Sequence, residues 1–190
     1  SWYNSCMHVR FSTCIGTPVL EEGGDTALGV LSGILIHPDT GKIEGFLVHV
    51  QAMSGKGDLF CSSSDIVRWG TRVYLRSASV LPPPEDRIRL QTLLQDPRTV
   101  LGQRIRTETG TRLGRCKDIQ FNTDVMHIEW LFPRKIFRWG IALPVSDILE
   151  ITPASIIVND PIAKARVSKE QKEPVSAPVS EMEPGVALRK

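Results

Sequence analysis

The chain has 190 residues, of which 41% are hydrophobic and 23% charged, and its formal net charge is +2 at pH 7. This length fits one ordinary domain or two small ones, and the composition excludes a chain that is disordered or fibrous throughout. The excess positive charge lies in residues 164–190, so residues 1–163 are formally neutral, which argues against a dedicated nucleic-acid-binding protein but not against a local basic patch.

The first half of the chain has the pattern of β-structure. A run rich in β-branched residues, Gly29 to Ile36, is followed by Pro38-Asp39-Thr40-Gly41 and then by an alternating run from Ile43 to Val50. Proline fixes φ, aspartate bonds its own backbone, and glycine accepts a left-handed conformation. This spacing therefore predicts a β-hairpin.

A proline-rich stretch separates the two halves. Pro82-Pro83-Pro84 predicts a stiff spacer, because proline cannot donate to a sheet ladder. A short helix is predicted over Glu85–Gln95, with acidic residues in its first turn and Asp96-Pro97 at its end. Its apolar side chains should pack against the β-structure; they are Ile88, Leu90, Leu93 and Leu94.

The second half predicts another set of short strands. Leu113–Phe121 and His127–Phe132 form a second hairpin pattern around the turn residues Asn122-Thr123-Asp124. Further strands are expected over Ile136–Leu143 and Ser155–Val158.

The two halves repeat one pattern at a spacing of about 85 residues. The equivalent positions, in order, are Ile15-Gly16 with Leu101-Gly102, Leu28-Gly29 with Leu113-Gly114, Ile34 with Ile119, Ile43-Glu44 with Ile128-Glu129, Ser64-Asp65-Ile66 with Ser146-Asp147-Ile148, and Tyr74-Leu75 with Ile156-Ile157. We therefore expect an all-β protein made of two duplicated small domains. Each copy should close into a compact barrel, with Ser146 capping a helical turn in the second.

Four segments follow from these boundaries. They are the first barrel (12–81), the proline-rich linker with its short helix (82–99), the second barrel (100–162) and a C-terminal tail (163–190). The tail combines three prolines with mixed charge and few large apolar residues, which predicts disorder in the free chain.

The order of these motifs resembles that of the PRC-barrel family. The first copy carries Ile15-Gly16-Thr17-Pro18-Val19, Leu28-Gly29, Ile43-Glu44-Gly45 and Ser64-Asp65-Ile66. The second carries Leu101-Gly102-Gln103-Arg104-Ile105, Leu113-Gly114-Arg115 and Leu143-Pro144-Val145-Ser146-Asp147-Ile148. The resemblance covers about 130 residues in two copies plus the linker.

The resemblance implies small, strongly bent β-barrels in tandem. Similar domains occur in the photosynthetic reaction-centre H subunit, in the RimM-type ribosome maturation factor and in small bacterial and archaeal proteins. Unlike the H subunit, this chain shows no membrane helix, and unlike the maturation factor it has two PRC-like copies. In these settings the domain resembles a non-catalytic docking surface, so no catalytic or cofactor residue is carried over.

Cysteine usage and hydropathy suggest a location. Cys6, Cys14, Cys61 and Cys116 show no C-x-x-C spacing, so we expect buried thiols in a reducing compartment and no zinc site. No apolar run approaches the ~18–20 residues that span a bilayer, and no signal-peptide core is visible. The cytoplasm is the default location, although the start at Ser1 leaves an upstream segment open.

Candidate catalytic groups lack partners in the sequence. We expect the four histidines to lie on strand faces and not to bind a metal; they are His8, His37, His49 and His127. The serines at 62–64 have no general base nearby. Gly55-Lys56-Gly57 and the stretch from Gly110 to Arg115 lack the spacing of a phosphate loop and predict turns. We expect no enzyme activity, no metal and no cofactor.

The strongest candidate for binding is a basic-aromatic hairpin in the second copy. It consists of Phe132, Arg134, Lys135, Phe137, Arg138 and Trp139. Arginine and aromatic residues are typical of protein-interface hot spots and also of single-strand stacking platforms. In the competing interpretation, the three aromatic side chains alternate into the core while the three cations are solvated. Trp69 and Trp130 are predicted to make contacts within the core or between the barrels.

Two functions are compatible with these patterns. The favoured one is a non-catalytic adaptor that presents two barrels to a protein partner, with the tail folding on binding. The alternative is a ribosome-maturation or RNA-associated factor, in which the hairpin touches RNA or a ribosomal protein. Exposed barrel edges would also permit a homodimer, which one sequence does not decide.

Overall fold

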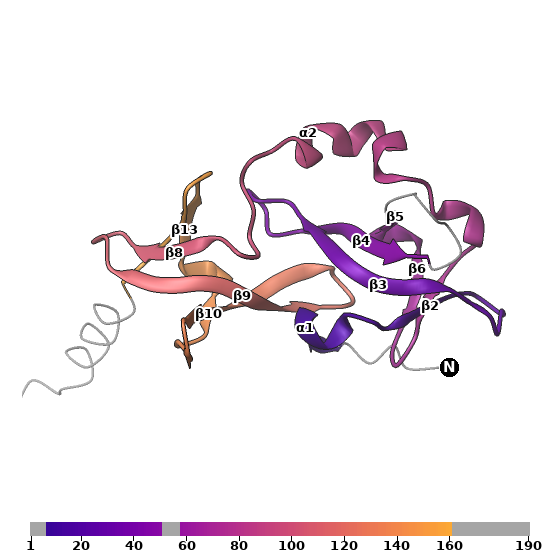
Figure 1. Cartoon of the computed structure of the whole chain (residues 1–190), viewed down its shortest axis with the longest axis horizontal. Helices are drawn as coiled ribbons and strands as arrows, with labels where there is room; N and C mark the ends of the chain where they lie inside the picture. Colours follow the sequence, from indigo (N-terminus) through magenta and orange to yellow (C-terminus); the bar gives the residue numbers. More distant parts are fainter. Residues whose placement is uncertain (1–6, 51–57, 161–190) are drawn as a thin grey trace, which may run out of the picture. The chain divides into compact units, whose positions relative to one another are not determined.

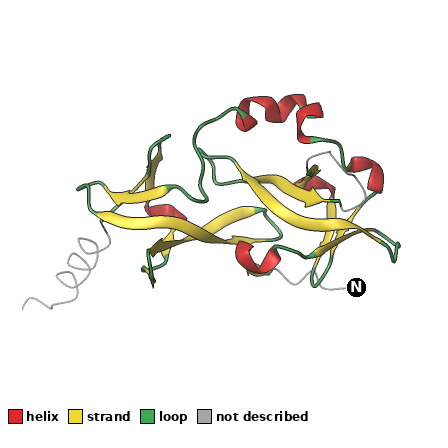
Figure 2. Cartoon of the chain, in the orientation of Figure 1, coloured by secondary structure: helices red, strands yellow, loops and turns green. Residues whose placement is uncertain are grey.

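The structure, a computed structural model, describes residues 7–50 and 58–160. The predicted disordered tail, Cys6 and the predicted turn at Gly55-Lys56-Gly57 lie outside these residues. Strands dominate the described part, and its helices are all short (Figure 1, Figure 2). The expectation of an all-β protein is confirmed.

The first sheet has six strands in the order β5-β4-β3-β2-β7-β6. Neighbouring strands are antiparallel except β2 and β7, which run parallel with Val19 opposite Val73. A 3-10 helix, η1 (Ser63–Asp65), leads from β5 into β6. The strands are β2 (Pro18–Glu21), β3 (Ala27–Ile36), β4 (Ile43–His49), β5 (Leu59–Ser62), β6 (Ile66–Trp69) and β7 (Val73–Leu75).

The second sheet has eight strands, with the main order β11-β10-β9-β8-β14-β13. β1 (His8–Arg10) pairs with β9, and β12 (Leu143–Pro144) pairs with β10. The helix α1 (Phe11–Cys14) follows β1, and η5 (Val145–Asp147) leads into β13. The main strands are β8 (Arg104–Thr107), β9 (Arg112–Asn122), β10 (His127–Lys135), β11 (Arg138–Trp139), β13 (Ile148–Ile151) and β14 (Ile156–Val158).

The internal repeat is visible in the backbone hydrogen bonds. The N–H of Gly16 donates to the carbonyl of Leu31 at 2.8 Å, and at the equivalent place the N–H of Gly102 donates to the carbonyl of Cys116 at 2.7 Å. Both glycines have a positive φ, 82° and 79°, which explains why each copy carries an Ile-Gly or Leu-Gly pair at this turn. The two sheets also share one strand order, including the parallel pair β2–β7 or β8–β14.

Several local expectations are wrong. Neither sheet closes on itself among the described residues, so the closed barrels are not seen. The strand expected over residues 136–143 is broken into β11 and β12, since residues 136 and 137 form a hairpin turn. Ser146 lies inside η5, whose N-cap is Pro144, so it does not cap that turn from the N-cap position.

The predicted linker helix is also wrong in detail. The segment forms three short pieces instead of one helix: η3 (Pro84–Asp86), η4 (Ile88–Leu90) and α2 (Gln91–Leu94); another 3-10 turn, η2 (Ala78–Val80), precedes the prolines. Leu90 is buried, whereas Ile88 is 87% exposed. The helical path is interrupted at Arg87, whose backbone is extended with φ −93° and ψ 91°.

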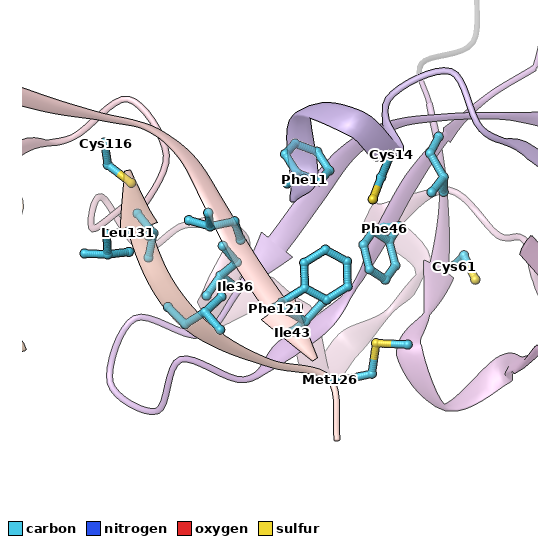
Figure 3. Close-up of a cluster of buried hydrophobic side chains, with 14 of the residues drawn as sticks. Phe11, Cys14, Ile36, Ile43, Phe46, Cys61, Cys116, Phe121, Met126 and Leu131 are labelled. Carbon is cyan, nitrogen blue, oxygen red and sulfur yellow. The ribbon is translucent and has the colours of Figure 1, made fainter. Parts of the chain in front are cut away.

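One hydrophobic core draws side chains from both sheets (Figure 3). The ring of Phe46 on β4 lies 5.0 Å from that of Trp69 on β6 and 5.9 Å from that of Phe121 on β9, between ring centroids. The prediction that Trp69 makes core or inter-domain contacts is confirmed. The backbone joins the sheets as well, because the N–H of Ile43 donates to the carbonyl of Met126 at 2.8 Å.

Candidate docking surface

The basic-aromatic segment forms a tight hairpin between β10 and β11. Arg134 lies opposite Trp139 and Lys135 lies opposite Arg138 in the strand register. This pairing leaves Ile136 and Phe137 as the two turn residues, which we call the hairpin tip. A two-residue connection restricts the backbone of the turn and places both residues at the end of the sheet.

The hairpin tip is strongly exposed. Phe137 is 90% and Ile136 84% exposed, and Trp139 beside them is 54% exposed. The interpretation that Phe137 and Trp139 alternate into the core is therefore wrong. Trp130, which the sequence placed in the core or between the domains, is also exposed, at 39%. Large apolar side chains gathered at one exposed place are typical of an interaction site.

Arg10, on the N-terminal strand β1, covers the base of this hairpin. Its guanidinium carbon lies 4.0 Å from the centroid of the Phe132 ring and 5.3 Å from that of Trp139. Arg134 adds a second cation–π contact, 5.4 Å from the Trp139 centroid. These contacts hold Trp139 in place and half-bury Phe132.

A buried carboxylate fixes Arg10. Asp118 on β9 is 1% exposed in its side chain and accepts a hydrogen bond from Arg10 Nε at 2.8 Å. The Ser12 backbone N–H donates to Asp118 Oδ1 at 2.9 Å, and the Ser12 hydroxyl donates to Oδ2 at 2.5 Å. The Ile119 N–H adds a fourth bond at 2.9 Å. These bonds attach the N-terminal segment to the second sheet, and we call this attachment the N-terminal strap. They also give the buried carboxylate the hydrogen-bond partners that a buried charge needs.

Sequence reasoning missed this strap. The predicted boundary of the first barrel at residue 12 separates Arg10 from everything it contacts. One signal was available: Asp118 is a lone acid between Cys116 and Ile119 on a predicted strand, where a buried carboxylate needs a cationic or donor partner. Nothing in the sequence identified Arg10 as that partner, because the pairing of β1 with β9 spans more than 100 residues.

A cationic groove lies next to the hairpin tip. It has a volume of about 960 Å³, and Ile105, Gly114 and Ile136 contribute its non-cationic lining. No acidic residue lines it. Its cationic side chains are Arg104, Arg106, Arg112, Arg115, Lys117, Arg134 and Lys135.

Strand register explains how the groove collects so many cations. Arg104 on β8 lies directly opposite Arg115 on β9, which lies directly opposite Arg134 on β10. Directly opposed residues point to the same face of a sheet, so these three side chains form one row, which we call the arginine row. Sequence reasoning identified only Arg134 and Lys135, because the pairing register was unknown.

Gly114 shapes the groove by allowing β9 to approach β10 closely. Its φ is +129°, and an added Cβ would lie 2.7 Å from the Arg134 carbonyl oxygen. We expect Gly114→Ala to lower the free energy of unfolding by about 2 kcal/mol, because the side chain adds a clash to an unfavourable φ. Gly70→Ala is the control, since its Cβ would have only one neighbour, at 3.9 Å. Equal denaturant midpoints for the two variants would contradict this role of Gly114.

The cysteines of the described residues are buried. Burial raises the pKa of the Cys14 thiol to about 11 and those of Cys61 and Cys116 to about 12, so these cysteines are poor nucleophiles. Their burial confirms the sequence prediction for three of the four cysteines.

Two of the four histidines, His8 and His49, pair with carboxylates, and His37 and His127 contact backbone groups. His49 Nδ1 lies 2.9 Å from Asp58 Oδ1, and the Ser32 hydroxyl donates to Asp58 Oδ2 at 2.6 Å. Hydrogen bonds from Ser32 and His49 hold the pKa of Asp58 below its ordinary value. The carboxylate stands between serine and histidine, so histidine does not serve as base for the serine as it does in a catalytic triad.

Within residues 7–50 and 58–160, no group of three or more His, Cys, Asp or Glu side chains is placed to hold a metal ion. No helix of this part is both long and apolar enough to cross a bilayer. No protein-family model matches the chain, and a comparison with curated proteins gave no significant match.

Proposed function

We propose that the protein is a non-catalytic adaptor, built from two tandem PRC-type domains, that docks a protein partner on the β10–β11 hairpin. The observation that carries this proposal is the exposure of Phe137 and Ile136 on a two-residue turn. Exposing large apolar side chains is unfavourable in water, and a partner that covers them would recover that free energy. Arg138 and Trp139 supply the residue types most common in hot spots.

Rigidity also supports docking at this place. Asp118 fixes Arg10, and Arg10 lies over Phe132 and Trp139. A surface held in its bound conformation loses little entropy when a partner binds. The hairpin therefore meets two requirements of a binding site, apolar exposure and a fixed geometry.

Site-specific photo-crosslinking tests the proposal. A photoreactive phenylalanine analogue at position 137, expressed in cells of the source organism, should cross-link to a protein. The same analogue at Val125, which is 66% exposed in the turn between β9 and β10, is the matched control and should not yield that product. A cross-link to a second copy of this chain would identify a homodimer. The same product from both positions, or none from either, would refute docking at the hairpin.

RNA is the second candidate ligand, and one observation favours it. The groove beside the hairpin gathers seven cationic side chains, and a basic groove with aromatic neighbours is typical of single-strand binding. In this role the protein would be an RNA-associated or ribosome-maturation factor. Cross-linking from position 137 to RNA instead of protein would favour this function over the adaptor.

A further inference from the structure

The cationic groove gathers positive charge from a part of the chain in which basic and acidic residues are nearly equal in number. Residues 100–163 hold eight basic and seven acidic residues, yet seven of those basic side chains line the groove and no acidic one does. Among residues 7–50 and 58–160, no ion pair involves any of the seven. The net charge of residues 100–163 is therefore close to zero, although their positive charges cluster at the groove.

This arrangement is unfavourable in the free protein. The arginine row places like charges directly opposite one another on three adjacent strands, which destabilises a sheet. Arg106 Nε is buried and has no hydrogen-bond partner within the described part of the chain. A buried donor without an acceptor is costly and needs an explanation. An anionic ligand in the groove would relieve the repulsion, and Arg106, which lines the groove, could bind it by turning its guanidinium group toward it.

We infer that the groove binds a segment rich in aspartate and glutamate that belongs to the protein partner of the hairpin. This inference rests on the proposed function. Arginine guanidinium groups bind carboxylates through two parallel hydrogen bonds, and five of the seven cations are arginines. Ile136 belongs both to the hairpin tip and to the groove lining, so one segment can place carboxylates in the groove and an apolar side chain on the tip.

Three observations favour an acidic protein segment over RNA. Guanidinium groups of Arg10 and Arg134 already lie over the Trp139 ring, which limits its use for stacking bases. Ile136, which is 84% exposed beside Phe137, has no π-face to offer a base. Residues 1–163 are formally neutral, so they lack the general positive potential that draws nucleic acid to a protein.

Fluorescence anisotropy with the full chain tests the inference. The probe is a labelled peptide of about twelve residues, mostly glutamate around a central leucine pair; the comparison probes replace glutamate by glutamine, or use oligouridylate of the same length. Arg115→Glu reverses the charge at the centre of the arginine row. It should keep the fold, because glutamate would face Arg104 and Arg134. The matched control is Arg72→Glu, at an exposed arginine between β6 and β7 of the first sheet.

We expect the glutamate peptide to bind the native chain, and Arg115→Glu to weaken that binding by about tenfold or more, since the substitution turns an attraction into a repulsion. Arg72→Glu should change the affinity for the glutamate peptide by less than about twofold. Added salt should weaken binding of this peptide to the native chain. Absence of peptide binding, equal binding of the glutamine peptide, or tighter binding of oligouridylate would each overturn the inference. Cross-linking of a protein from position 137 is measured independently, so docking at the hairpin could stand while the acidic segment fails.

A stability measurement provides a second readout. If the arginine row is kept for a ligand, neutralising one end should stabilise the free protein. Arg104→Gln should shift the urea midpoint of unfolding to a higher concentration at low salt, with a smaller shift at high salt. The same variant should weaken binding of the glutamate peptide. A loss of stability in Arg104→Gln would show that the row is structural and would count against the inference.

Discussion

Replacing Phe46 with alanine should lower the free energy of unfolding by about 4 kcal/mol, the largest effect we expect from one substitution. Phe46 is fully buried, and its ring contacts those of Trp69 and Phe121. Alanine would remove these contacts and leave a cavity between the first and second sheets. Urea unfolding followed by circular dichroism measures the change.

The matched control for this prediction is another phenylalanine in a different environment. Phe137→Ala should leave the unfolding midpoint almost unchanged, because that side chain is already in water. A double-mutant cycle between Phe46→Ala and Phe121→Ala should give a coupling of about 1 kcal/mol, since the rings touch across the two sheets. Additive effects of the two substitutions would show that the sheets do not stabilise each other through these rings.

The sequence was most informative where local chemistry determines structure. The turn at Pro38-Asp39-Thr40-Gly41 and the alternating run after it predicted the hairpin formed by β3 and β4. The paired glycines at 16 and 102 predicted the repeat because each occupies the same positive-φ turn. In both cases the residues that specify the conformation lie within a few positions of one another.

The sequence was least informative where long-range pairing determines structure. The cationic groove depends on the register that aligns Arg104, Arg115 and Arg134, and no local pattern reveals that register. The pairing of β1 with β9 brings Arg10 to the hairpin from the far end of the chain. The hairpin itself was identified from its composition, but its exposure was not, because alternation alone does not say which face of a strand is buried.

Asp118 shows how such a long-range contact controls the docking surface. Asp118→Ala should lower the free energy of unfolding by about 3 kcal/mol, because it removes a buried carboxylate that accepts four hydrogen bonds, from Arg10, Ser12 and Ile119. Arg10→Ala should cost less, since Asp118 would keep its three bonds from Ser12 and Ile119. Urea unfolding of both variants measures this order.

Asp118→Ala should also change the β10–β11 hairpin, although Asp118 is not part of it. Without the carboxylate, Arg10 loses the bond that holds it over Phe132 and Trp139, so the hairpin should become more mobile although none of its own residues has changed. We expect Trp139 to become more accessible to acrylamide quenching, measured with the other tryptophans replaced by phenylalanine, and cross-linking from position 137 to decrease. Unchanged quenching and cross-linking in a folded Asp118→Ala variant would show that the Asp118 contacts do not affect the docking surface. A decrease in cross-linking would make Asp118 a positioning residue that acts through Arg10.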